Sequence, residues 1–277
     1  MDNKIPEIKR SRGYLLYDTK GKRYLDFYQD SGRAILGHRL EGISGVIKST
    51  VARGLTASYS SVYKNRMENE LKLLFPEVLE FRIYRNIERL LNALSELHSK
   101  EVLFNNFIDF PSVVSEFCIW RPFTGTTLNW NSFDYFIPKL PFPGNFGPVV
   151  LAVNKKSEFP APSDDLSPMI YDMLIKSVAS LIKHGKNDNC MDRSVFESPL
   201  WERIGPYLRF KLKGEEYSEL FAKALKHSVL LPPNSDIPGI IPCYYEKGQI
   251  KGFIDMIRLV ESKLSARLCN QRGDYGS

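Results

Sequence analysis

The segment from Gly13 to Gly54 constrains the fold more than any other part of this 277-residue chain. It predicts two short β-strands, Tyr14–Tyr17 and Arg23–Phe27, joined by a turn with the sequence Asp-Thr-Lys-Gly. Asp and Gly favour a turn between β-prone runs, because Gly21 can adopt a positive φ angle without steric cost. A Leu-Gly-His triplet ending at His38 follows, and then apolar residues recur at helical spacing. The predicted order is therefore hairpin, turn and helix.

The remainder of the chain alternates predicted helices with short apolar runs, which is typical of α/β and α+β folds. Val149–Val153 is the most strand-like run, and Ser167 followed by a proline is a typical helix start. We expect a further strand at Glu101–Phe104 and a helix at Trp201–Leu208. The stretch that reaches to about residue 145 is rich in aromatic residues and prolines, which predicts loops and edge strands.

Composition excludes several classes of protein. Hydrophobic residues make up 43% of the chain, enough for a buried core. The net charge is +6, but the basic residues are scattered, which predicts a solvated surface and no nucleic-acid partner. The chain has no apolar run of membrane-spanning length and its first residues lack a signal-peptide core, so we expect a cytoplasmic protein without a membrane partner. The four cysteines form no Cys-x-x-Cys pair and predict reduced thiols and no metal site.

Two ordered motifs resemble class III aminotransferases, which are fold-type I pyridoxal-phosphate enzymes. The family pattern Gly-x-x-Leu-x-Asp-x-x-Gly-x-x-Tyr-Leu-Asp-Phe, followed by Leu-Gly-His, is matched from Gly13 to His38. Near the other end, Ser228-Val-Leu-Leu-Pro-Pro is similar to the family's Gly-Val-Leu-Leu-x-Pro, with serine in place of glycine. The chain therefore resembles a shortened and divergent member of the glutamate-1-semialdehyde aminomutase or ornithine aminotransferase branch.

The resemblance implies an α/β fold of the fold-type I class, in which a reduced large domain contains a mainly parallel sheet. We expect three parts: a hairpin and helix segment at residues 1–60, the reduced large domain at 61–198, and a small C-terminal α+β domain at 199–277. Enzymes of this family place their active site at a dimer interface. The resemblance thus also implies a homodimer, or a heterodimer with a related subunit.

The same resemblance implies a phosphate-binding loop. The family pattern Phe-x-x-Ser-Gly-x-Glu-Ala corresponds here to the stretch that begins at Phe81 and continues into a predicted helix. Arg85, Asn86 and Glu88 are the candidate cofactor-binding residues. Asn86 and Ile87 stand where the family has a glycine and a small hydroxyl residue, so the backbone cannot approach an anion as closely and no hydroxyl is supplied.

The catalytic groups of the family are a lysine that forms a Schiff base with pyridoxal phosphate and an aspartate that pairs with the pyridine nitrogen. The lysine usually follows an apolar strand and precedes glycines. Lys155 and Lys156 follow the Val149–Val153 run and are the candidates, although no glycine comes next. The aspartate usually belongs to an Asp-Glu dipeptide, which this sequence lacks. Asp164-Asp165 is the nearest equivalent, and it is expected to cap the helix that follows.

Two functions from different classes follow. The first is a degenerate homologue without the Schiff-base lysine and the pyridine-nitrogen aspartate, which acts as a non-catalytic binding or scaffolding protein. The alternative is an active pyridoxal-phosphate-dependent transaminase or aminomutase that uses Lys155 or Lys156 on an amino-group-bearing small molecule. An anion or nucleotide binder that exploits the basic surface remains a third, weaker reading of the charge.

Overall fold

The computed structural model describes residues 4–125, 129–143, 147–155, 159–186 and 193–273, with side chains up to residue 263. The chain divides into two compact units, of which unit 1 comprises residues 1–39 and 189–277 and unit 2 comprises residues 40–188. The expected boundaries at residues 60 and 198 differ from these. The difference arises because the N-terminal strands form one sheet with a strand from the C-terminal part of the chain.

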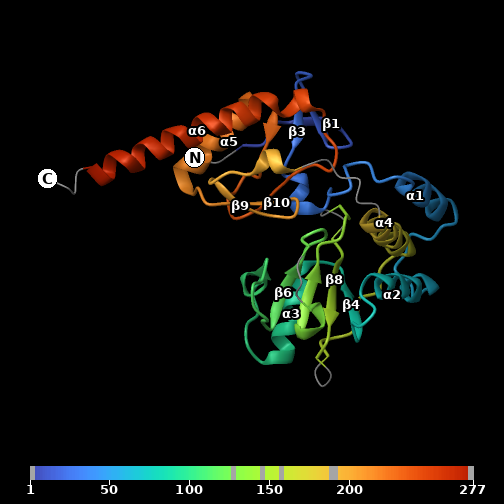
Figure 1. The fold of residues 1–277 in the computed structure, drawn as a ribbon. Helices are drawn as coiled ribbons and strands as arrows, with labels where there is room; N and C mark the ends of the chain where they lie inside the picture. The colour runs from blue at the N-terminus through green and yellow to red at the C-terminus, as the bar shows by residue number, and fades with distance from the viewer. Residues whose placement is uncertain (1–3, 126–128, 144–146, 156–158, 187–192, 274–277) are drawn as a thin grey trace. The chain divides into compact units, whose positions relative to one another are not determined.

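The described residues of unit 1 form two small sheets and the helices α5 and α6 (Figure 1). The first sheet has the order β1-β2-β3-β11, and the second has the order β12-β10-β9. Helices α5 and α6 belong to the same unit, and short 3₁₀ turns lie at Gln29–Gly32 and Ser194–Phe196. The bounds are β1 Ile8–Arg12, β2 Leu15–Asp18, β3 Arg23–Asp26, β9 Trp201–Ile204, β10 Tyr207–Phe210, α5 Gly214–Lys226, β11 Val229–Leu230, β12 Gly239–Ile240 and α6 Lys247–Gly273.

The predicted hairpin is confirmed as β2 and β3, which pair antiparallel. The Asp18 carboxylate accepts hydrogen bonds from the backbone N–H groups of Lys20 and Lys22, and Gly21 adopts a φ of 83°. The aromatic residue that closes the motif, Phe27, is fully buried, and its ring packs against those of Phe196 and Phe253. The motif therefore supplies both the turn and the centre of the unit 1 core.

Two sequence-based predictions in unit 1 are wrong. The segment Trp201–Leu208 was expected to be helical, but it forms the β9–β10 hairpin, since Gly205 adopts a φ of 58° and precedes a proline. The cysteines were expected to be reduced thiols. Cys118 in unit 2 is free and buried, but Cys243 is disulfide-bonded.

Unit 2 contains a five-stranded sheet of order β4-β8-β7-β6-β5 with helix α3 against it, together with helices α1, α2 and α4 (Figure 1). Helix α4 packs against α1 and α2. Short 3₁₀ turns occur at Phe104–Asn106 and Trp130–Ser132. The bounds are α1 Ile43–Ala52, α2 Val62–Leu74, β4 Glu80–Tyr84, α3 Ile87–His98, β5 Ile108–Asp109, β6 Phe117–Trp120, β7 Tyr135–Pro138, β8 Val149–Val153 and α4 Pro168–Lys186.

The α/β class is confirmed, but the sheet is mixed where a mainly parallel one was expected. β5, β6 and β7 pair in parallel, whereas β8 runs antiparallel to both β7 and β4. The aromatic stretch was expected to form loops and edge strands, yet β6 and β7 lie inside the sheet and their side chains are largely buried. The expected strand at Glu101–Phe104 is absent from the described residues, and a 3₁₀ turn begins at Phe104 instead.

Candidate functional site

The expected phosphate-binding loop lies where β4 ends and α3 begins. Asn86 has extended backbone angles and is the N-cap of α3, because its side-chain oxygen accepts a hydrogen bond of 2.8 Å from the backbone N–H of Arg89. Glu88 lies exposed in the first turn of the helix, where an acidic side chain interacts favourably with the helix dipole. Both residues therefore have structural roles at the helix start, and their contact with a cofactor stays a prediction.

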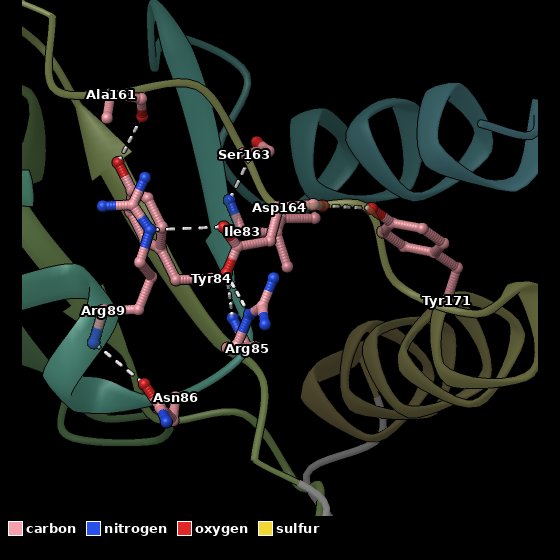
Figure 2. A network of polar contacts seen from close by, with 9 residues as sticks. All are labelled: Ile83, Tyr84, Arg85, Asn86, Arg89, Ala161, Ser163, Asp164 and Tyr171. Carbon is pink, nitrogen blue, oxygen red and sulfur yellow. Dashed lines mark hydrogen bonds and ion pairs between the residues drawn. The ribbon is translucent and has the colours of Figure 1, made fainter. Parts of the chain in front are cut away.

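The segment that contains Ala161, Ser163 and Asp164 lies along the edge of β4 that no other strand covers (Figure 2). The backbone N–H of Ile83 donates to the Ser163 hydroxyl at 3.0 Å, and the N–H of Asp164 donates to the Ile83 carbonyl at 2.9 Å. The Tyr84 hydroxyl donates to the Ala161 carbonyl at 2.6 Å. These bonds satisfy backbone groups that an edge strand would otherwise leave open. They also place Asp164 directly beside the first residues of α3.

The Asp164 carboxylate binds the N-terminal end of α3 (Figure 2). Its Oδ2 accepts from the backbone N–H of Arg85 at 2.9 Å and from Arg85 Nε at 3.2 Å, while Oδ1 accepts from Arg89 Nε at 3.4 Å. The Asp164 side chain is 8% exposed. Burial alone would raise its pKa, but the hydrogen bonds and positive charges of Arg85 and Arg89 outweigh burial and hold the pKa below its usual value.

This arrangement corrects the expectation that Asp164 caps the next helix. The carboxylate faces Arg85 and Arg89, whereas the backbone of Asp164 is tied to α4, because the Tyr171 hydroxyl donates to its carbonyl at 3.0 Å. A backbone N–H before a helix start, together with two guanidinium groups, forms a binding site for an anion. In this chain, one of its own carboxylates occupies that site.

Aromatic and glycine residues hold the network in place. The Arg89 guanidinium lies 5.8 Å from the centre of the Tyr84 ring, and burial raises the pKa of the Tyr84 phenol to about 12. Gly147 adopts a φ of 93°, and a Cβ atom there would lie 2.4 Å from the Arg85 carbonyl oxygen. Only glycine therefore allows the segment before β8 to pass so close to Arg85.

Lys155, one of the two predicted lysines, does not lie beside this network. Lys156 lies outside the described residues. Lys155 lies just after β8, which pairs antiparallel with β4. Val153, the last residue of β8, pairs with the first residue of β4, and Val149 pairs with Tyr84, the last residue of β4. At about 3.3 Å per residue, the two ends of β8 are about 13 Å apart. Lys155 and Arg85 therefore lie at opposite edges of the sheet, where an edge is the side at which the strands begin or end.

Sequence reasoning missed two residues that lie at the same edge as Arg85. β6 and β7 run in parallel and end together, with Trp120 paired to Pro138, and the next residues are Arg121 and Lys139. The Lys139 N–H donates to the Trp120 carbonyl at 2.9 Å. The signal was present: Lys139 follows a buried apolar strand and precedes two glycines of the sequence, the pattern expected of the family's cofactor lysine.

Arg121 occupies the end of β6 as half of an ion pair. Its side chain is 4% exposed, and Nε and Nη2 each lie 2.7 Å from a carboxylate oxygen of Asp109 at the end of β5. The Arg121 guanidinium also lies 5.3 Å from the centre of the Phe110 ring. The end of β6 therefore carries a buried, paired arginine. Among the described residues, no three His, Cys, Asp or Glu side chains gather as metal ligands would.

The fold of this chain is similar to those of an aminotransferase and an aminomutase of known structure. A glutamate-1-semialdehyde aminomutase from Pseudomonas aeruginosa superimposes with a TM-score of 0.64 over 91% of this chain and 86% of that protein, at 11% identity. Ornithine aminotransferase from Plasmodium yoelii gives a TM-score of 0.61 over 91% of this chain and 92% of that chain, at 14% identity. These similarities establish the fold and leave the activity open.

The sequence relatives are less informative about activity. An uncharacterised protein of Borreliella burgdorferi is 29% identical over 268 residues, which cover 95% of this chain and 94% of that protein. A glutamate-1-semialdehyde 2,1-aminomutase of Thermus thermophilus is 32% identical over 73 residues, 26% of this chain and 17% of that enzyme. No family model matches the chain. Among the described residues, no helix is long and apolar enough to cross a membrane.

Proposed function

We propose that this chain is a non-catalytic relative of class III aminotransferases that acts as a binding or scaffolding protein. The observation that carries the proposal is the Asp164 carboxylate, which accepts the Arg85 N–H and lies between two guanidinium groups at the start of α3. In the family that this chain resembles, the corresponding loop binds the cofactor phosphate. A phosphate brought there would meet a buried carboxylate of the same sign.

The residues at this sheet edge do not fit pyridoxal phosphate. The position after β6 is held by Arg121, whose guanidinium is a permanent cation with donors only, so it cannot accept a hydrogen bond from a protonated pyridine nitrogen. The guanidinium is also paired to Asp109 through two contacts of 2.7 Å. The Asp164 carboxylate at the start of α3 and the paired Arg121 guanidinium at the end of β6 both disfavour the cofactor at this sheet edge, which supports a role without it.

A second candidate is an active pyridoxal-phosphate-dependent transaminase or aminomutase acting on an amino-group-bearing small molecule. The observation in its favour is Lys139, which lies at the same sheet edge as Arg85. Lys155, at the other edge, is the weaker choice of lysine on geometry.

The absorbance spectrum distinguishes the two candidates. The purified chain is incubated with excess pyridoxal phosphate and desalted, and the spectrum of the retained protein is recorded. We expect no retained cofactor absorbance. A retained band that is lost on borohydride treatment and in Lys139→Ala, but kept in the matched control Lys155→Ala, would establish the second candidate and overturn the first.

The proposal includes a dimer, either with a second copy or with a related subunit. Apolar side chains are exposed along α1, α2 and the segment between them: Val51, Tyr59, Val62 and Leu73. Such surfaces often mark contacts with another protein. Light scattering coupled to gel filtration measures the mass of the particle, and a monomer at micromolar concentration would contradict a homodimer.

We also propose a cytoplasmic location. The free, buried Cys118 thiol suits a reducing compartment, whereas the disulfide at Cys243 argues in the other direction. Fractionation of cells into cytoplasmic, membrane and exported material tests the location. Recovery outside the cytoplasmic fraction would contradict it.

A further inference from the structure

A cavity of about 490 Å³ lies in unit 1, and its lining includes no residue of the Asp164 network, which belongs to unit 2. Its walls come from the β2–β3 hairpin, from the turn between α5 and β11, and from the first turns of α6. Leu25, which is buried, contributes an apolar part of the lining. Cavities of a few hundred cubic ångströms suit small molecules. The inference below does not depend on the proposed function, because the two sites share no residue.

Three ionisable side chains from three separate segments line this cavity: Arg23 of β3, His227 after α5 and Glu246 before α6. Within the part of the chain that the structure describes, none of these three side chains has a hydrogen-bond or ion-pair partner. The neighbouring Lys22, by contrast, donates from Nζ to the Leu225 carbonyl at 2.8 Å. All three residues are exposed to solvent, so a ligand that enters the cavity meets a cation and an anion that are not paired with each other.

Two glycines of α6 keep the cavity open. A Cβ atom at Gly252 would lie 3.1 Å from Nδ1 of His227, so a glycine there lets the imidazole lie against the helix. A Cβ atom at Gly248 would have no neighbour within 4 Å, so a larger side chain at this position extends into open space at the cavity wall. Gly248 belongs to the first turn of α6, whose unpaired N–H groups and dipole favour negative charge.

We propose that this cavity binds a free α-amino acid. The Arg23 guanidinium binds the ligand carboxylate as a fork of parallel donors, with support from the start of α6, and the Glu246 carboxylate binds the ligand ammonium group. The volume leaves room for the ligand side chain beside His227. Opposite charges from two separate segments favour a zwitterion over a simple anion or a simple amine.

The test is a binding measurement on the full chain. The twenty common L-amino acids are compared by thermal shift, and those that stabilise are titrated by calorimetry alongside acetate and methylamine as single-charge probes. We expect saturable binding of one or more amino acids and no binding of either probe. Arg23→Gln and Glu246→Gln should each weaken binding about tenfold or more, the loss of one charge-assisted contact.

Gly248→Leu provides a variant that narrows the cavity and retains the charges, and it should weaken binding. Its matched control is Gly45→Leu on α1, because Gly45 is likewise an exposed helical glycine without neighbours. Both variants should unfold at or above the wild-type temperature, since leucine is the better helix former. Failure of every amino acid to bind, unchanged binding in Arg23→Gln and Glu246→Gln, or equal binding of acetate would each overturn the proposal.

Discussion

Two buried aspartates, one in each unit, are held by different kinds of contact. The Asp26 side chain in unit 1 is 1% exposed, and it accepts from the N–H groups of Tyr28 and Gln29 and meets His38 Nε2 at 2.6 Å, all within 12 residues. Asp164 in unit 2 binds Arg85 and Arg89, which lie 79 and 75 residues earlier. The contacts of Asp26 come from nearby residues of one sequence motif, whereas the contacts of Asp164 form only when distant parts of the chain fold together.

The largest effect is expected for Asp26→Ala. The change leaves two backbone N–H groups and His38 without their partner in the core of unit 1, which should lower the free energy of unfolding by about 3–5 kcal/mol. Urea unfolding followed by circular dichroism measures the loss. Asp255→Ala, on an exposed position of α6, is the control and should change stability by less than about 0.5 kcal/mol. Equal losses in both variants would contradict the local network.

The next comparison uses two glycines with positive φ angles that lie against a carbonyl. Gly147→Ala places a Cβ atom 2.4 Å from the Arg85 oxygen in unit 2, and Gly37→Ala places one 3.3 Å from the Gly13 oxygen in unit 1. We expect losses of about 2–4 and about 1–3 kcal/mol, because the positive φ angle strains both variants and a severe steric clash adds to the strain in the first. The same unfolding assay ranks them. A smaller loss for Gly147→Ala would mean that the segment before β8 does not approach Arg85 so closely.

Asp164→Ala should have a moderate effect on stability. The Arg85 N–H loses its acceptor and the two arginines lose their carboxylate, but the Arg85 side chain is 67% exposed and water replaces much of the interaction. We expect a loss of about 1–2 kcal/mol. Asp165→Ala is the control on the neighbouring exposed aspartate. A loss equal to that of the control would show that the carboxylate contributes nothing to the sheet edge.

Comparison of wild type with Asp164→Ala also gives a pH dependence of stability, and its sign follows from the pKa of Asp164. The fold lowers this pKa, so the unfolded chain binds the proton more readily and the contribution to stability is present above the unfolded value of about 3.9. As the pH falls through the folded pKa, the contribution is lost. The stability difference between wild type and Asp164→Ala should therefore be constant near neutral pH and shrink below about pH 4. A difference that grows in acid would contradict the assignment.

The smallest predicted effect is a gain. Ser228 replaces the glycine of the family pattern and adopts a φ of 61°, where a side chain is strained. Ser228→Gly should relieve the strain and raise the free energy of unfolding by up to about 1 kcal/mol, a gain reduced by the greater freedom of glycine in the unfolded chain. Thermal unfolding detects such a change. A lower stability would mean that the serine makes a contact worth more than the strain.

The sequence predicted those parts of the fold that depend on neighbours in the chain. The β2–β3 hairpin with Gly21 and the helix after His38 followed from turn and helix signals. The β9–β10 hairpin was missed, because its apolar spacing also suits a helix and the Gly205-Pro turn was overlooked. The inner strands β6 and β7 were missed because they are short and rich in aromatic residues, and the lysine that follows β7 was missed with them.

The candidate site was less accessible to sequence reasoning. The resemblance located the loop containing Arg85 and Asn86. It could not locate the partner of that loop, because four strands of the sheet lie between the loop and Asp164 along the chain. The pairing of Arg121 with Asp109 likewise depends on the parallel register of β5 and β6. The interpretation of these two contacts as a site without a cofactor therefore comes from the geometry of the structure.

The most direct test of this account is a titration of pyridoxal phosphate into wild type and Asp164→Ala, followed by absorbance and calorimetry. If the Asp164 carboxylate occupies the anion site at the start of α3, the wild type should show no saturable binding. Asp164→Ala should bind the phosphate group measurably, in competition with inorganic phosphate, because it exposes the Arg85 N–H and two guanidinium groups. Tight binding by the wild type that Asp164→Ala does not improve would contradict the account.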